Sequence, residues 1–216
     1  MHVVFREARG LDLNEAPFDP GQTPADLVVL SFSDSDLGAF AAGWHRGRGA
    51  LPTLRLQNLI ALKHPLSVDT YADAVLAHAK GILIRLIGGE GYWPHGLATV
   101  QDLARRRGIA LAVLPADGRA DPALDALSTL PVSTLRRLAA LCDAGGAVAA
   151  QAALAQLALA AGLYAGPVAG AKEVPAFGWY DPDMGVVAAP VKDASGACPP
   201  PPSPPHEGEG RRGRDA

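Results

Sequence analysis

The chain has 216 residues, of which 49% are hydrophobic, and this size fits one ordinary domain that buries roughly 70% of its unfolded surface. Its 19 Lys and Arg residues against 22 Asp and Glu residues give a formal net charge of -3. This balance excludes the basic field that binding of nucleic acid or of an anionic membrane usually requires, so we expect neither partner.

Short apolar runs alternate with helical patterns along the first 130 residues. Residues 27–32 and 82–87 read as buried strands because they are rich in β-branched and leucine side chains. The full set of expected elements comprises strands at 2–5, 27–32, 53–57, 82–87 and 109–114, and helices at 34–44, 67–79 and 97–107. Crossovers of about twenty residues between strands favour a doubly wound parallel α/β sheet, flavodoxin-like or Rossmann-like, over residues 1–130.

Local signals predict where the helices begin and end. Ser33 lies before the first helix and Ser67 before the second, and both are good amino-terminal caps. The third helix ends in Arg105, Arg106 and Arg107, cations that suit the negative end of a helix, and Gly108 closes it.

The pattern changes to helices alone after residue 130. Pro131 suits a first helical turn, Gly145 and Gly146 form a break, and residues 147–161 make a second helix. This pair either packs against the sheet edge or begins a helical subdomain. We assign residues 131–185 to a helical extension with a loop or short hairpin at 176–185. Residues 186–216 form a Pro/Gly/Arg-rich tail that we expect to be disordered.

Cysteine usage and the first residues favour a reduced, cytoplasmic protein. Cys142 and Cys198 are far apart, and no cysteine or histidine spacing typical of a metal site exists. Residues 1–6 lack the pattern of a secretory signal. The most hydrophobic window, 147–161, contains two glutamines and is shorter than the ~20 residues that span a bilayer. We therefore expect neither export nor a membrane span.

Two loops at the ends of predicted strands hold the candidate substrate-binding residues. Open α/β sheets bind ligands at the carboxyl ends of their strands. The polar loop could instead cap a helix, and the glycine-rich loop could be a tight turn with two packing aromatics. The substrate-binding candidates are Ser33, Asp34, Ser35 and Asp36 in the first loop and Gly88, Gly89, Tyr92 and Trp93 in the second.

The remaining polar residues predict no further site. His64 and His95 lie in loops without a second ligand at short spacing, so we expect no metal site. No nucleophile and base pair is recognisable, so no catalytic residue is assigned. The glycine-rich loop lacks the Gly-Lys-Ser/Thr ending of a phosphate loop.

The order and spacing of several segments resemble the amino-terminal region of the CobN-type large subunit of aerobic cobaltochelatase, which is related to the large subunit of magnesium chelatase. These segments are residues 24–37, 51–59, 64–69, 79–89 with Tyr92 and Trp93, and 127–131. The resemblance covers residues 1 to about 185 and implies a place in cobalamin and tetrapyrrole biosynthesis.

By this resemblance the family reaction is the ATP-dependent insertion of cobalt into hydrogenobyrinic acid a,c-diamide, a ligase reaction that forms nitrogen–metal bonds. The resemblance also implies a corrinoid substrate and AAA+ ATPase partner subunits, which hold the ATP, while this chain binds no cofactor of its own. Because a CobN-type subunit is several-fold longer, we expect a truncated fragment that is inactive alone. The alternative is a stand-alone α/β binding or assembly module for a corrinoid or a partner subunit.

Overall fold

The computed structural model of the chain describes residues 16–163, 179–181 and 185–187. The described residues fall into two units, of which 16–163 form the first. The second contains the antiparallel strands β5 (Trp179–Asp181) and β6 (Gly185–Val187), which agree with the hairpin alternative. The strand predicted at 2–5 and the tail from residue 188 onward lie outside the described residues.

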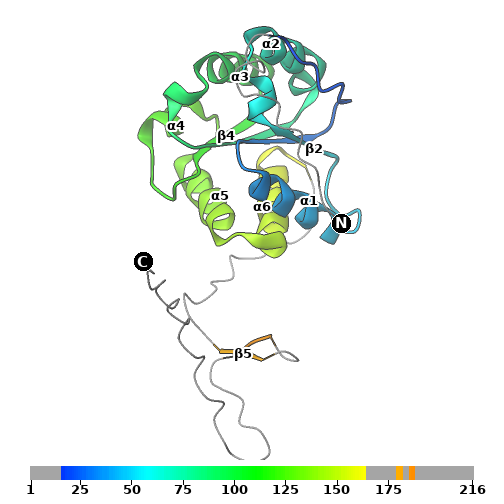
Figure 1. The fold of residues 1–216 in the computed structure, drawn as a ribbon, viewed down its shortest axis with the longest axis vertical. Coiled ribbons are helices and arrows are strands. Elements are labelled where there is room, and N and C mark those ends of the chain that lie inside the picture. Colours follow the sequence, from blue (N-terminus) through cyan, green and yellow to red (C-terminus); the bar gives the residue numbers. More distant parts are fainter. Residues whose placement is uncertain (1–15, 164–178, 182–184, 188–216) are drawn as a thin grey trace, which may run out of the picture. The chain divides into compact units, whose positions relative to one another are not determined.

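A four-stranded parallel sheet forms the centre of the first unit (Figure 1). Its strands are β1 (Leu27–Ser31), β2 (Leu54–Asn58), β3 (Gly81–Leu86) and β4 (Ala110–Pro115), in the order β2-β1-β3-β4. Leu27 pairs with Leu54 on one side and with Gly81 on the other. The predicted parallel α/β class is confirmed. After β1 the chain adds β2 on one side, and it then returns to add β3 and β4 on the other side of β1. The boundary between β1 and β3 is therefore a topological switch point of the flavodoxin-like kind.

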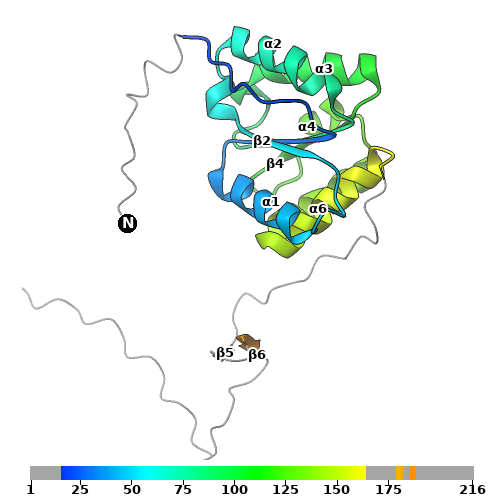
Figure 2. The same ribbon diagram turned by 90° about the vertical axis from the view of Figure 1, so that its right-hand side faces the viewer.

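Helices cover both faces of this sheet (Figures 1 and 2). Alternate β1 residues point to opposite faces, so Val28 and Leu30 join one apolar cluster while Leu27 and Val29 join the other. The first cluster contains residues of α2 (Pro65–Ala74), α3 (Pro94–Arg107) and the short α4 (Pro122–Leu127). The second contains residues of α1 (Asp34–Arg46), α5 (Val132–Ala144) and α6 (Gly146–Ala160).

The α5 and α6 pair therefore packs on a face of the sheet. Leu135, Leu138 and Leu141 of α5 are buried in the same cluster as Leu83 of β3. Gly145 and Gly146 have φ values of 67° and 73°, which allow the break predicted between the two helices. The division of the chain at residues 130 and 185 stays a prediction.

The predicted cap of α2 was wrong. The helix begins at Pro65, and His64 Nδ1 accepts a hydrogen bond from Leu66 N at 3.1 Å. Ser67 is 1% exposed, and its Oγ accepts a hydrogen bond from Phe18 N at 2.7 Å. The ring of Pro65 presets a helical φ, so the helix starts before Ser67.

The same helix also ends earlier than predicted. It stops at Ala74, and a 3-10 turn (η3, Leu76–His78) completes the segment. Two further 3-10 turns follow β2 and β3, namely η2 (Leu59–Leu62) and η4 (Glu90–Tyr92). By contrast, Gly108 closes α3 at a φ of 68°, as its position predicted.

Candidate functional site

The carboxyl edge of the sheet brings the two predicted loops together at the switch point between β1 and β3. The β1 loop leads into α1, and the β3 loop leads through η4 into α3. Phe32 in the first loop and Tyr92 in the second make an edge contact, with ring centroids 5.2 Å apart and planes at 89°. The two loops are therefore neighbours, as the ligand-crevice rule for open sheets predicts.

Hydrogen bonds fix the backbone of the β1 loop. Ser33 N donates to Ser31 Oγ at 3.0 Å, and Asp36 N donates to Ser33 Oγ at 3.3 Å. Ser31 Oγ and Asp36 Oδ2 lie 3.0 Å apart, and Asn58 Nδ2 at the end of β2 donates to Asp34 Oδ1 at 2.6 Å. The capping alternative for Ser33 is therefore realised, while the exposed Asp34 and Ser35 still face solvent.

Arg85 of β3 was not predicted as a site residue, yet it lies at the centre of this region. It is 4% exposed; its Nε lies 3.4 Å from Asp36 Oδ2, and its Nη2 lies 3.1 Å from Asp143 Oδ1. The Nε has no hydrogen-bond partner among the described residues. A buried guanidinium needs such carboxylates because desolvation of an unpaired charge is costly. The signal in the sequence was a single cation inside the apolar run 82–87.

A pocket of about 170 Å³ opens beside this arginine. Asp36 and Ser35 from the β1 loop line it together with Arg85, Cys142 and the turn at Gly145. Burial raises the pKa of the Cys142 thiol to about 11, while the neighbouring Arg85 acts in the opposite direction. The thiol is therefore protonated at neutral pH and is a poor nucleophile.

The glycines of the second loop line a different hollow, of about 320 Å³, between the ends of β3 and β4. Gly88 and Gly89 have φ values of 88° and 75°, and a Cβ on Gly88 would lie 2.9 Å from the Tyr92 ring. Asp117, Arg119 and Asp121 provide the polar groups of this hollow. Of the predicted residues, Ser35 and Asp36 line the first hollow and Gly88 and Gly89 line the second, so the predicted set does not line one pocket.

The two predicted aromatic residues differ in exposure. Tyr92 is 59% exposed. Trp93 is 4% exposed, and its Nε1 donates to Leu62 O at 2.8 Å within the core. The packing alternative therefore describes Trp93, and Tyr92 with Phe32 is the aromatic surface that remains for a ligand. Ile60 and Ile87, both exposed, extend the apolar surface of this edge.

The two histidines expected in loops have structural partners, and His95 lies in the first turn of α3 instead of a loop because Pro94 starts that helix. His64 caps α2, and His95 Nε2 lies 2.9 Å from Asp69 Oδ1. Among the described residues, no group of three or more His, Cys, Asp and Glu side chains could hold a metal ion. Within the same residues, no helix has the length and apolar character needed to cross a membrane.

Comparison with known proteins gives two close sequence relatives. Over 147 residues, 68% of its length, the chain is 40% identical to the aerobic cobaltochelatase subunit CobN of Sinorhizobium sp. Over 146 residues it is 38% identical to the subunit of the same name from Pseudomonas aeruginosa. The chain spans 11% and 12% of the lengths of these two relatives. No family model matches it.

A solved structure shares the fold. The catalytic subunit of cobaltochelatase from Mycobacterium tuberculosis superposes with a TM-score of 0.55 at 23% identity, covering 69% of this chain and 11% of that one. This similarity supports the α/β architecture of the described unit. The resemblance seen in the sequence segments is thus confirmed by the two sequence relatives.

Proposed function

The chain is homologous to the CobN subunit of aerobic cobaltochelatase over 68% of its length, and on that premise we propose that it supplies one α/β domain of a cobaltochelatase large subunit. The reaction it would serve is the ATP-dependent insertion of cobalt, as substrate, into hydrogenobyrinic acid a,c-diamide. AAA+ ATPase subunits would be its partners and would hold the ATP. The observation that carries the proposal is the 40% identity over 147 residues.

We expect the 216-residue chain by itself to insert no cobalt. It spans 11% of the Sinorhizobium relative, so most of that subunit has no counterpart in this sequence. The direct measurement supplies the chain with the ATPase subunits, ATP, Co²⁺ and the corrinoid, and follows the corrinoid absorption spectrum. Cobalt insertion under these conditions would contradict the proposed fragment role.

Within this role, the carboxyl edge of the sheet is the surface that we propose contacts the corrinoid. The exposed Tyr92 ring, which lies perpendicular to the Phe32 ring in an edge-to-face contact, offers aromatic surface to a macrocycle. Ser33, Asp34, Ser35 and Asp36 present polar groups beside it. Gly89 lets the backbone approach a ligand closely because it carries no side chain, and Gly88 makes room for the Tyr92 ring of this surface.

A chimeric subunit tests both parts of this proposal. The homologous 146-residue stretch of the Pseudomonas aeruginosa subunit is replaced by that of this chain, and cobalt insertion is measured with the ATPase subunits. We expect activity in the chimera and a higher corrinoid KM after Tyr92→Ala. Leu159→Ala is the matched control, because Leu159 is also 59% exposed but lies on α6. An inactive, folded chimera would contradict the domain assignment, and equal effects of the two substitutions would contradict the binding surface.

A stand-alone binding or assembly module is the second candidate. The observation that favours it is the covering of both sheet faces by helices within residues 16–163, which gives this unit its own apolar core. The two candidates differ in one measurement. A stand-alone module would bind a corrinoid or the ATPase subunits with micromolar or tighter affinity as the isolated chain, whereas a dependent domain would not.

A further inference from the structure

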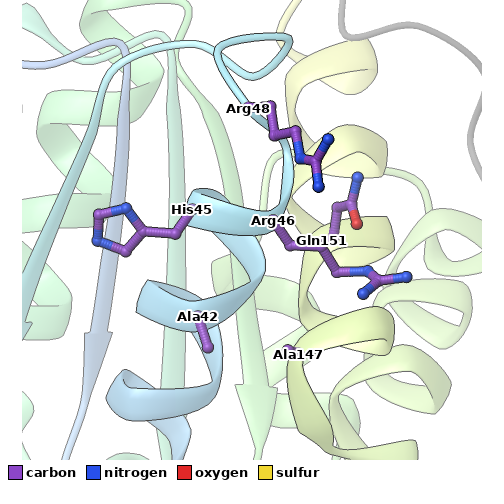
Figure 3. A pocket seen from close by; sticks show the side chains of 6 residues that line it. All are labelled: Ala42, His45, Arg46, Arg48, Ala147 and Gln151. Carbon is purple, nitrogen blue, oxygen red and sulfur yellow. The ribbon is translucent and has the colours of Figure 1, made fainter.

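A surface groove of about 650 Å³ lies beside the carboxyl end of α1 (Figure 3), at the opposite end of that helix from the β1 loop. Alanines from α1 and α6 line its floor, and polar side chains line its rim. The lining residues are Ala42, His45, Arg46, Arg48, Ala147 and Gln151. The groove contains two guanidinium groups and no carboxylate.

The polar groups of the groove converge. In Figure 3, Arg46 and Arg48 both extend to the side of Gln151, whereas His45 points away from them. Arg46 and Arg48 are exposed, and neither makes an ion pair or a side-chain hydrogen bond with any residue of the described range 16–163. Each guanidinium carries five N–H donors in a fixed plane, and the Gln151 amide adds two more. These donors are available to a ligand that carries acceptors.

The backbone at Arg48 is unusual. Its φ is 47°, and among the described residues it is the single non-glycine residue with a positive φ. Gly49 beside it also has a positive φ, of 84°, which costs glycine little, whereas the same conformation is strained for an arginine. The helix dipole alone explains why Arg46 lies at the negative end of α1. It does not explain why an arginine occupies the strained backbone position 48.

Tight helix packing holds the two sides of the groove in place. A Cβ on Gly43 would lie 2.6 Å from Gln151 N and 2.9 Å from Ala147 O, so the backbones of α1 and α6 are in direct contact. Gln151 and the last turn of α1 are therefore fixed relative to each other. Such a rigid pair of elements can present donors in one geometry.

We propose that Arg46, Arg48 and Gln151 form a binding site for a ligand with two or more carboxylate groups. Guanidinium groups bind carboxylates through two parallel hydrogen bonds, and two of them, at the last residue of α1 and two residues beyond it, match two carboxylates. The partial negative charge at the end of α1 opposes bound anions, and it opposes a compact phosphate dianion more than charge that is spread over a larger ligand. Either a free polycarboxylic acid or the carboxylate rim of a corrinoid has this chemistry.

Calorimetric titration of the full chain at low salt tests the site. The probes are citrate, cobyrinic acid, whose side chains end in carboxylates, cobinamide, whose side chains end in amides, and inorganic phosphate. We expect citrate and cobyrinic acid to bind and the two others to bind more weakly. The stronger of the two binders identifies the source of the carboxylates, and the citrate result does not depend on the proposed function.

Matched variants separate recognition from folding. The double substitution Arg46→Gln with Arg48→Gln should weaken binding by about tenfold or more, since two charge-assisted contacts are lost. Lys63→Gln with Arg105→Gln removes two exposed cations elsewhere and should leave the affinity within about twofold. Arg48→Gly should weaken binding without lowering the melting temperature, because glycine adopts the positive φ freely.

Four results would overturn the proposal. They are no binding of either carboxylate probe below millimolar concentration, equal affinity of the folded double variant and the native chain, equal affinity for cobinamide and cobyrinic acid, and tighter binding of phosphate than of citrate.

Discussion

Gly43→Ala is predicted to destabilise the protein although alanine is the better helix former. Gly43 lies inside α1, where α1 crosses α6. The added methyl group would meet Gln151 N at 2.6 Å and Ala147 O at 2.9 Å. Both are backbone atoms of α6, so no side-chain rotation relieves the contact and the two helices must move apart.

The magnitude follows from two opposing effects. Alanine in place of glycine in a helix interior stabilises by about 1 kcal/mol, whereas overpacking of a tight contact costs about 1 to 3 kcal/mol or more. Separation of the helices also weakens packing along the seam that includes Phe40. We expect a net loss of about 1 to 2 kcal/mol in the free energy of unfolding.

Gly38→Ala in the same helix is the matched control. A Cβ at Gly38 meets nothing within 4 Å, so only the helix propensity remains and we expect a gain of about 0.5 to 1 kcal/mol. Urea unfolding followed by circular dichroism measures both variants. The pair should differ by about 1.5 to 3 kcal/mol, or roughly 3 to 12 °C in melting temperature. If Gly43→Ala were as stable as Gly38→Ala, the reasoning from close helix contact would be refuted.

Three further predictions concern ionisable groups. Arg85→Met leaves Asp36 and Asp143 without their cation and should cost about 2 to 3 kcal/mol of unfolding free energy in urea; an unchanged midpoint would show that these pairs contribute little. A hydrogen bond from the Thr53 hydroxyl is the main cause that lowers the pKa of Asp26 below its ordinary value of 3.8. The ionised Asp26 carboxylate therefore stabilises the folded state above pH 3.8, and this stabilisation is lost as the pH falls through the lowered pKa. Asp26→Asn should therefore destabilise at pH 7 but not at pH 2, and equal losses at both pH values would contradict this. With Cys198 replaced by serine, Cys142 should react slowly with iodoacetamide at pH 8 until urea unfolds the chain, because its thiol pKa is about 11; fast labelling of the native protein would argue against this raised pKa.

The order of elements could be predicted because each strand and most helices have their own local pattern. The apolar runs of β1 and β3 are buried on both sides, and such runs need no knowledge of their neighbours to be recognised. Crossover lengths then made a parallel sheet the expected arrangement. The resemblance to the CobN-type subunit likewise rested on linear segments, and the sequence relatives confirmed it.

Helix boundaries were less predictable where two local signals competed. Ser67 is a good cap by residue type, but Pro65 allowed an earlier start and Ser67 became a buried partner of Phe18 N. The short helix α4, capped by Asp121, was missed because its six residues are too few to show a period. The choice between these signals depends on contacts with distant segments.

The sequence by itself determined the α/β class, the two loops at the switch point and the family resemblance, because these follow from periods, turns and segment order along the chain. Only the tertiary structure decided that Trp93 is core while Tyr92 is exposed, and that Arg85 meets Asp36 and Asp143. It also brought Arg46 and Arg48 beside Gln151 across the seam of α1 and α6. Such pairings join residues far apart in sequence, and burial and charge act through distances in space that no local pattern contains.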